Sequence, residues 1–248
     1  IIITDRSDIN DMNLHLHFDI NPTIQSICKP IVINPDFSSI AAITTAAYGL
    51  KINNFKIIQN PSIGYLPDLS ICEQPDKIFL GILKEHNLLN IELKGLFSET
   101  EMEITYNGQN ETPFEISIKQ FPDLFPYLAT VAILSNSGTY IIHDIDRLAN
   151  KESNRALAIL NEFNKFGANC TIKNNDFIIK PLDKELLLPD NYIINTYNDH
   201  RIAMALAILI LSITNNFDKI KFDNEKCLNK SYPSFMEDLK KLFEYKNA

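Results

Sequence analysis

The densest cluster of chemically versatile side chains in this sequence is the pentapeptide Lys151-Glu152-Ser153-Asn154-Arg155. If it begins a helix, Lys151 and Arg155 are four residues apart and face the same way, and their like charges repel unless an anion or a carboxylate lies between them. Glu152 would then project about 100° around the helix, where it could donate or accept a proton. Charged residues are common in the first turn of a helix, so the pentapeptide alone is weak evidence for a functional site.

Arginine is rare in this chain, which draws attention to the positions where it occurs. Of the 23 basic residues, only Arg6, Arg147, Arg155 and Arg201 are arginine. The planar guanidinium binds a carboxylate or a phosphate through two parallel hydrogen bonds, which lysine cannot do. Arg155 and Arg201 both stand at the start of a predicted helix, where a positive charge opposes the helix dipole. This placement favours the binding of an anionic ligand, and a structural salt bridge to a nearby acid is the alternative.

Three segments of the sequence share one order of features, which indicates an internal repeat. Each begins with an aspartate that can cap a helix, continues through an apolar helix rich in Ala, Ile and Leu, and ends in a short strand. A second, amphipathic helix follows in every case. The units begin at Asp36, Asp123 and Asp199; the apolar helices cover 40–50, 127–134 and 202–211, the strands 55–58, 139–142 and 219–222, and the amphipathic helices 76–86, 152–166 and 232–245.

The repeat also predicts how the elements are arranged. The apolar helices are hydrophobic on nearly all sides, so they should lie inside, with the strands and the amphipathic helices around them. Helix N-termini carry free N–H groups and the positive end of the helix dipole, so several of them facing one cleft would form an anion-binding surface. Charged or hydroxyl side chains stand at these starts: Ser38, Ser39, Asp123, Lys151, Glu152, His200, Arg201, Lys230 and Ser231.

Composition and charge argue against several classes of protein. The 248 residues include only 7 glycines, and the sequence contains no glycine-rich nucleotide-binding motif. The net charge of −8 argues against a nucleic-acid coat protein. No apolar run is long enough for a transmembrane helix, and the four cysteines are expected to be free or buried thiols of a reducing, cytoplasmic setting. His15 and His17 alternate along a strand-like segment, where an exposed strand face is favoured over a metal site.

Two segments carry the densest groups of polar side chains at the predicted helix starts: Asn150-Lys151-Glu152-Ser153-Asn154-Arg155 and Tyr197-Asn198-Asp199-His200-Arg201-Ile202-Ala203-Met204. They resemble two signature segments of the EPSP synthase (3-phosphoshikimate 1-carboxyvinyltransferase) family. The matching segments follow the family's order and spacing over roughly residues 31–245. The resemblance implies an α/β fold of the enolpyruvyl transferase type, in which repeated βαβαββ units form an inside-out α/β barrel lobe. The match extends to Pro122-Asp123, Asp36-Phe37-Ser38-Ser39 and Lys230-Ser231-Tyr232-Pro233.

The resemblance implies a reaction and a role for each matching residue. The family transfers the enolpyruvyl group of phosphoenolpyruvate to the 5-hydroxyl of shikimate 3-phosphate and releases phosphate, a step of chorismate and aromatic amino acid biosynthesis. By resemblance, Asp123, with Lys151 beside it, handles the proton of the shikimate hydroxyl, and Glu152 handles the proton at C3 of the enolpyruvyl group. No metal or other cofactor is implied. Substrate-binding roles are implied for Arg155, His200, Arg201 and Lys230, and less directly for Ser38 and Ser39.

Members of the family are longer than this chain and have two lobes. The resemblance therefore divides the chain into residues 1–60, a remnant of the shikimate-phosphate lobe, and residues 61–248, most of the phosphoenolpyruvate lobe. The sequence opens Ile1-Ile2-Ile3-Thr4 without a methionine, and it lacks the Lys-Ser-rich segment with which the family's first lobe begins. We expect a cytoplasmic, monomeric fragment that does not turn over substrate by itself.

Two other functions remain open. One is UDP-N-acetylglucosamine enolpyruvyl transferase, which shares the fold and the reaction type, although its counterpart segments lack the Lys-Glu-Ser and Asn-Asp-His-Arg patterns. The other is a non-enzymatic α/β repeat scaffold such as a clamp, although a ring around DNA would need lysines along an inner face, and the lysines here are scattered. Binding of phosphoenolpyruvate and shikimate 3-phosphate would separate the enzyme from the scaffold.

Overall fold

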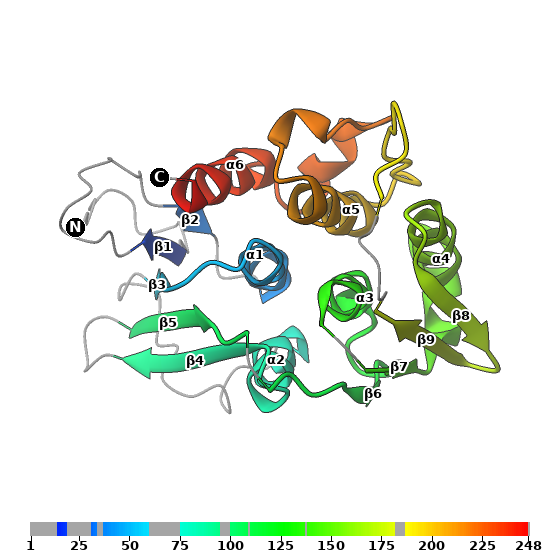
Figure 1. The fold of residues 1–248 in the computed structure, drawn as a ribbon, viewed down its shortest axis with the longest axis horizontal. Helices are drawn as coiled ribbons and strands as arrows, with labels where there is room; N and C mark the ends of the chain where they lie inside the picture. The colour runs from blue at the N-terminus through cyan, green and yellow to red at the C-terminus, as the bar shows by residue number, and fades with distance from the viewer. Residues whose placement is uncertain are drawn as a thin grey trace.

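The structure, a computed structural model, describes residues 14–18, 31–33, 37–59, 75–94, 100–108, 110–136, 138–181 and 187–247. Within these ranges, three apolar helices pack against one another in the interior, and sheets and amphipathic helices surround them (Figure 1). The side chains of the inner helices are buried along most of their length, so the predicted interior position of the apolar helices is confirmed. The inner helices are α1 (Phe37–Gly49), α3 (Phe125–Leu134) and α5 (His200–Thr214).

The three inner helices run parallel and meet closely at their C-terminal ends. A Cβ atom added to Gly49, the last residue of α1, would lie 2.1 Å from Oγ of Ser212 in α5 and 3.0 Å from Cδ1 of Leu134, the last residue of α3. Glycine is therefore required for this close approach, because any larger residue would meet both neighbours. The N-terminal ends of the same helices gather at the opposite end of the molecule.

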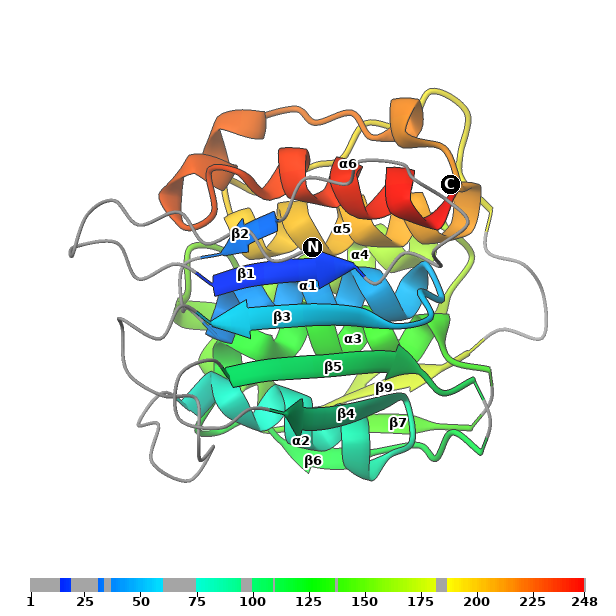
Figure 2. The same ribbon diagram turned by 90° about the vertical axis from the view of Figure 1, so that its left-hand side faces the viewer.

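Two sheets form much of the outer layer. Figure 2 shows the first of them facing the viewer, with the strand order β2-β1-β3-β5-β4 and antiparallel pairing throughout. The second sheet has the order β6-β7-β9-β8, and only its β6–β7 pair is parallel. The strands are β1 (Leu14–Phe18), β2 (Ile31–Ile33), β3 (Phe55–Gln59), β4 (Leu89–Lys94), β5 (Thr100–Tyr106), β6 (Glu115–Ser117), β7 (Tyr140–His143), β8 (Asn169–Lys173) and β9 (Asp176–Lys180).

The order of elements confirms the predicted βαβαββ repeat. The first unit is β2-α1-β3-α2-β4-β5 and the second is β6-α3-β7-α4-β8-β9, with the same strand order in both sheets apart from β1, which lies between β2 and β3. A third unit contains α5 and α6. The outer helices, each with one buried and one exposed face as predicted, are α2 (Ile78–Glu85), α4 (Arg155–Lys165) and α6 (Phe235–Lys246).

The predicted strand at 219–222 is wrong. The structure instead forms a 3-10 turn at Phe217–Lys219, followed by a single parallel bridge between Phe222 and Ile194. The side chain of Asn216 accepts a hydrogen bond from the backbone N–H of Asp218 (3.0 Å), which favours the turn over an extended backbone.

The amphipathic helix predicted from residue 152 begins later, at Arg155. The side chain of Asn154 caps it by accepting a hydrogen bond from the backbone N–H of Leu157 (3.2 Å). Lys151 and Glu152 therefore lie before the helix, in a bend that follows the 3-10 turn Ile145–Asn150. The expectation that Lys151 and Arg155 share one helical face is wrong for this reason.

The elements on either side of the predicted domain boundary at residue 60 share one sheet and one hydrophobic core. Strand β3 pairs with β5, and α1 packs against both α3 and α5. The division into residues 1–60 and 61–248 stays a prediction. Cys170 and Cys227 are buried free thiols, as expected, whereas Cys28, Cys72 and Asp36 lie outside the described residues. In the part of the chain that the structure describes, no helix has the length and apolar character needed to cross a membrane.

Candidate active site

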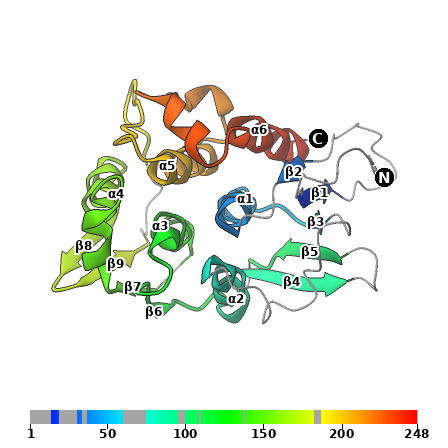
Figure 3. The same cartoon turned by 180° about the vertical axis from the view of Figure 1, so that it is seen from behind.

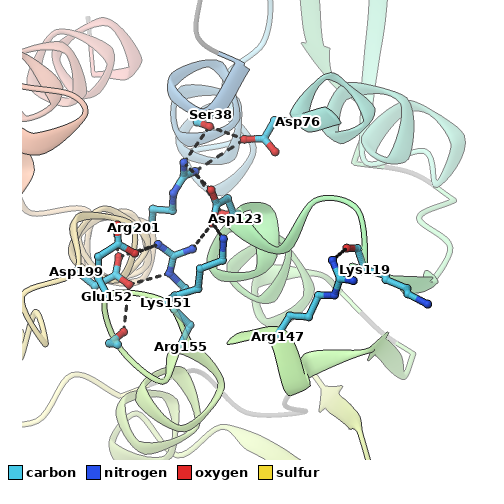
Figure 4. A network of polar contacts seen from close by, with 11 residues as sticks. Ser38, Asp76, Lys119, Asp123, Arg147, Lys151, Glu152, Arg155, Asp199 and Arg201 are labelled. Atoms are coloured by element: carbon cyan, nitrogen blue, oxygen red, sulfur yellow. Dashed lines mark hydrogen bonds and ion pairs between the residues drawn. The ribbon is translucent and has the colours of Figure 1, made fainter. Parts of the chain in front are cut away.

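The predicted site residues come together at the N-terminal ends of the inner helices. Ser38 lies in the first turn of α1, and Asp123 lies in the 3-10 turn Pro122–Leu124 that leads into α3. Arg155 is the first residue of α4, and Arg201 is the second residue of α5. Figure 4 shows these four side chains pointing toward one another, although each comes from a different helix start. We call this group, with Asp76, Lys151, Glu152 and Asp199, the charge cluster.

Asp123 is the centre of the charge cluster. Its Oδ1 lies 2.5 Å from Nη1 of Arg155 and 3.1 Å from Nζ of Lys151, and its Oδ2 lies 3.3 Å from Nη2 of Arg201. Partial burial alone would raise the pKa of Asp123, but the charges of Arg201 and Arg155 outweigh burial and lower the pKa to about 2. The predicted helix-capping role of Asp123 is wrong, because its carboxylate binds these cations and makes no capping hydrogen bond to the start of α3.

Arg155 is almost fully buried, with 1% of its side chain exposed, and its guanidinium contacts three carboxylates. Besides Asp123, it binds Asp199 through Nε at 2.7 Å and Glu152 through Nη2 at 2.8 Å. Burial would lower the pKa of Arg155, but the hydrogen bond and charge of Asp199, followed by those of Asp123, raise it instead. The prediction that Glu152 points away from Arg155 is therefore wrong.

Arg201 links all three repeat units. Its Nη2 donates to Oγ of Ser38 (3.1 Å) in the first unit, and its Nη1 lies 3.9 Å from Oδ2 of Asp76 and donates to the backbone oxygen of Asp123 (3.4 Å). Ser38 in turn donates a hydrogen bond to Asp76, which lies in the 3-10 turn Pro75–Lys77 before α2. Arg201 thus contacts several groups of the chain itself, and the binding of an anionic ligand by Arg201 stays a prediction.

The other predicted residues lie around the charge cluster. His200, the first residue of α5, is buried, and its Nδ1 has no hydrogen-bond partner in this structure. Burial, and next the positive charge of Arg201, lower the pKa of His200, so the ring is neutral near pH 7. Ser39 is buried next to Ser38 in α1. Lys230 approaches only indirectly, because its Nζ donates to the backbone oxygen of Asn198 (3.4 Å), just before Asp199.

Two carboxylates of the charge cluster, Asp76 and Asp199, were not among the predicted site residues. Asp199 was expected only to cap a helix, and it does accept a hydrogen bond from the backbone N–H of Arg201 (3.0 Å). Its position two residues before the rare Arg201 is the sequence signal that could have indicated a second role. The repeat itself points to Asp76, because an acid precedes the second helix of the first unit just as Glu152 precedes that of the second.

The arrangement combines cationic groups, which can bind anions, with carboxylates, which can exchange protons. Three cations and several helix starts surround the carboxylates of Asp123 and Glu152, which are about one-third exposed. Among the described residues, no group of three or more His, Cys, Asp or Glu side chains is placed to hold a metal ion. The cations and carboxylates of the charge cluster are groups that anion binding and proton transfer require.

Comparison with known proteins shows relatives of similar sequence. The chain is 38% identical over 169 residues to 3-phosphoshikimate 1-carboxyvinyltransferase of Clostridium kluyveri, which covers 68% of this chain and 36% of that protein. It is 31% identical over 234 residues to the protein of the same name from Thermoplasma volcanium, covering 92% of this chain and 49% of that protein. The chain thus spans between about a third and a half of the length of these relatives.

Solved structures agree in fold. The EPSP synthase from Acinetobacter baumannii superposes with a TM-score of 0.61 at 18% identity, over 91% of this chain and 56% of that chain. The enolpyruvyl transferase NikO from Streptomyces tendae gives a TM-score of 0.57 at 16% identity, over 84% and 43% of the two chains. The predicted enolpyruvyl transferase fold is confirmed. The sequence pattern described as EPSP synthase (3-phosphoshikimate 1-carboxyvinyltransferase) matches residues 9–239, and the chain therefore belongs to this family.

Proposed function

We propose that this chain provides the phosphoenolpyruvate-binding part of an enolpyruvyl transfer site. The transfer would be to the 5-hydroxyl of shikimate 3-phosphate, with release of phosphate, as the names of the relatives suggest. The observation that carries the proposal is the convergence of Lys151, Arg155 and Arg201 on Asp123 at the helix starts. A ligand with both a carboxylate and a phosphate suits several cations held close together.

The proposed reaction has two steps. In the first, the 5-hydroxyl oxygen of shikimate 3-phosphate forms a bond to C2 of phosphoenolpyruvate and loses its proton. At the same time C3 of phosphoenolpyruvate gains a proton. In the second, the bond from C2 to the phosphate oxygen breaks, and C3 loses a proton to restore the double bond. Asp123 and Lys151, whose charged atoms are 3.1 Å apart, would handle the hydroxyl proton, and Glu152 would handle the proton at C3.

The ion pairs of the charge cluster connect ligand binding to this proton transfer. The low pKa of Asp123 makes it a weak base while Arg155 and Arg201 are paired with it. A bound carboxylate or phosphate would neutralise part of the charge on these two arginines. The pKa of Asp123 would then rise, and its carboxylate would become a better proton acceptor once substrate is present. In this proposal Arg155, Arg201 and Lys230 hold the anionic groups, His200 lines the site, and Ser38 and Ser39 support it.

The remaining parts of the proposal concern the setting of the site. Residues 61–248 would form most of the phosphoenolpyruvate lobe, and residues 1–60 would belong to the lobe that binds shikimate 3-phosphate. We propose that the protein acts as a monomer in the cytoplasm. The three cations of the cluster, Lys151, Arg155 and Arg201, would face the anionic groups of the ligand, and no cofactor is included.

Calorimetric titration with phosphoenolpyruvate, alone and with shikimate 3-phosphate, tests the proposal. Arg201→Ala should weaken phosphoenolpyruvate binding by about 30-fold or more, because one partner of a buried charged contact is removed. Arg147→Ala is the matched control, because Arg147 donates to the backbone oxygen of Lys119 away from the cluster (Figure 4). Absence of binding by the unsubstituted chain, or equal loss in both variants, would contradict the proposal.

A phosphate-release assay with both substrates tests the expectation that the 248-residue chain does not turn over by itself. We expect no release above the background without protein. Sustained release by this chain alone would overturn that expectation, while leaving the assignment of the phosphoenolpyruvate site intact.

A further inference from the structure

Glu162 is a fully buried carboxylate in α4 that lies outside the charge cluster. Its Oε2 accepts a hydrogen bond from Oη of Tyr192 (2.5 Å), and its Oε1 accepts one from Oη of Tyr197 (2.8 Å). Lys165 donates to both oxygens, at 2.7 and 2.9 Å. A buried carboxylate is costly unless its oxygens are paired in this way. Its presence on the buried face of a helix therefore calls for an explanation beyond packing.

Glu162 and Arg155 lie on one face of α4. They are seven residues apart, which is close to two helical turns. Arg155 binds Asp199, and Glu162 binds Tyr197, which lies two residues before Asp199 in the chain. The same face of α4 thus holds both ends of the short segment that leads into α5, and Figure 3 shows α4 and α5 as neighbours.

This segment has an unfavourable backbone conformation. Tyr197 and Asn198 both have a positive φ, of 52° and 55°, which residues other than glycine rarely adopt twice in succession. Side-chain contacts hold the turn in place. Nδ2 of Asn224 donates to Oδ1 of Asn198 (2.7 Å), and the Tyr197 hydroxyl is fixed by Glu162. Directly after the turn come Asp199 and Arg201, so its geometry sets where these side chains point.

We propose that Glu162 is a positioning residue for the anion-binding site. Through the Tyr197 hydroxyl it holds the left-handed turn that directs Asp199 toward Arg155 and Arg201 toward Asp123. The expected effect on ligand affinity rests on the proposed function, whereas the effect on the Arg155–Asp199 contact rests on the geometry alone. Burial, and next the hydrogen bond to Glu162, raise the pKa of Tyr197 to about 12, so the hydroxyl remains a donor at neutral pH.

Tyr192 offers a matched comparison. It donates one hydrogen bond to the same carboxylate, but it lies before Ile194, whose bridge to Phe222 separates it from the left-handed turn. Each of the substitutions Tyr192→Phe and Tyr197→Phe therefore removes one hydroxyl that donates to the Glu162 carboxylate, and each leaves that carboxylate in place. If Glu162 had only a structural role, the two substitutions should affect the Arg155–Asp199 contact and ligand affinity equally. Tyr192→Phe could even have the larger effect, since Tyr192 is the more buried of the two tyrosines.

The test measures the Nε–H signal of Arg155 by NMR and the affinity for phosphoenolpyruvate by calorimetry. The variants are Tyr197→Phe, Glu162→Gln and Tyr192→Phe, all in the 248-residue chain. Tyr197→Phe and Glu162→Gln should shift the Arg155 signal, speed its exchange with water, and weaken phosphoenolpyruvate binding by about fivefold to tenfold. Tyr192→Phe should leave both readouts close to those of the unsubstituted chain.

An unchanged Arg155 signal in Tyr197→Phe would overturn the positioning role, and so would equal changes in Tyr192→Phe and Tyr197→Phe. If the unsubstituted chain binds no phosphoenolpyruvate, the proposed function fails by itself, and the Arg155 signal still decides whether Glu162 positions the turn. A Glu162→Gln variant that does not fold would leave Tyr197→Phe to decide the matter, because that substitution keeps the carboxylate and removes one hydroxyl.

Discussion

The buried carboxylate of Asp199 accepts a 2.7 Å hydrogen bond from Nε of Arg155, and both side chains are almost completely excluded from solvent. Its other oxygen caps α5 through the backbone N–H of Arg201. One side chain thus completes a helix start and neutralises the arginine at another.

We expect Asp199→Ala to destabilise the chain by about 3–5 kcal/mol, because it leaves a buried guanidinium without its main partner and removes a helix cap. Asp199→Asn should cost about 1 kcal/mol less, since asparagine still caps the helix. Urea unfolding checks both values. The exposed Asp218→Ala serves as a control that should stay within about 0.5 kcal/mol of the unsubstituted chain. A loss below 1 kcal/mol for Asp199→Ala would show that Arg155 does not need this partner.

Asp123 should make stability fall in acid. Its pKa is lower in the folded chain, at about 2, than its usual value of 3.8, so its contribution is fully present above about pH 4 and is lost as the pH falls toward 2. Asp123→Asn should therefore be less stable than the unsubstituted chain at pH 7, and the gap should shrink between pH 4 and pH 2. Unfolding by urea at several pH values measures the gap. A gap that stays constant over this range would contradict the assignment.

His143 should make the stability of the chain fall as the pH rises, which is opposite to the effect of Asp123. Its Nδ1 lies 2.7 Å from Asp176 and its Nε2 lies 3.0 Å from Glu115, and the hydrogen bond to Asp176 is the main cause of its raised pKa. The stabilisation is fully present below about pH 6.5 and is lost as the pH rises through the raised pKa. His143→Gln should thus cost most at pH 5.5 and least at pH 9. Thermal unfolding of both proteins across this range, with an NMR titration of the ring, would reveal any failure of this trend.

Gly49 should not tolerate a side chain. Gly49→Ala places a Cβ against Ser212 and Leu134, and we expect a loss of about 1–3 kcal/mol from overpacking. Adding Ser212→Ala should recover part of the loss, because Oγ of Ser212 is the nearest atom. Gly81→Ala, in α2, is the control: an added Cβ there meets nothing within 4 Å, so this variant should gain about 0.5–1 kcal/mol. Additive effects of the Gly49 and Ser212 substitutions in urea unfolding would argue against the close approach.

The parts of the structure that could be predicted from the sequence are those with strong local signals. The apolar character of α1, α3 and α5 and the one-sided apolar pattern of α4 and α6 sufficed to place these helices inside or outside. Arg155, Arg201 and Asp123 were predicted from residue type and motif, and the structure brings them together. The salt bridges that they form with one another were predicted only as an alternative to ligand binding.

The parts that escaped prediction depend on contacts between distant segments. Asp76 meets Arg201 because the 3-10 turn Pro75–Lys77 packs against α1, which in turn packs against α5, and no local pattern encodes that approach. The position of Lys151 was misjudged because the side chain of Asn154 ends the preceding loop and starts α4 three residues later than the charge pattern suggests. The missing strand at 219–222 reflects a competing side-chain hydrogen bond at Asn216, which overrides the extended preference of the residues that follow.

The hydrogen bond between Arg201 and Ser38 spans 163 positions of the chain. Such a contact can contribute only once the long loop between the two residues is closed, at a cost in chain entropy. The charge cluster can therefore be complete only after all three repeat units have docked. A ligand that binds Ser38, Asp123 and Arg201 together would protect the whole chain from unfolding as one cooperative unit, and slow hydrogen exchange throughout the inner helices would accompany its binding.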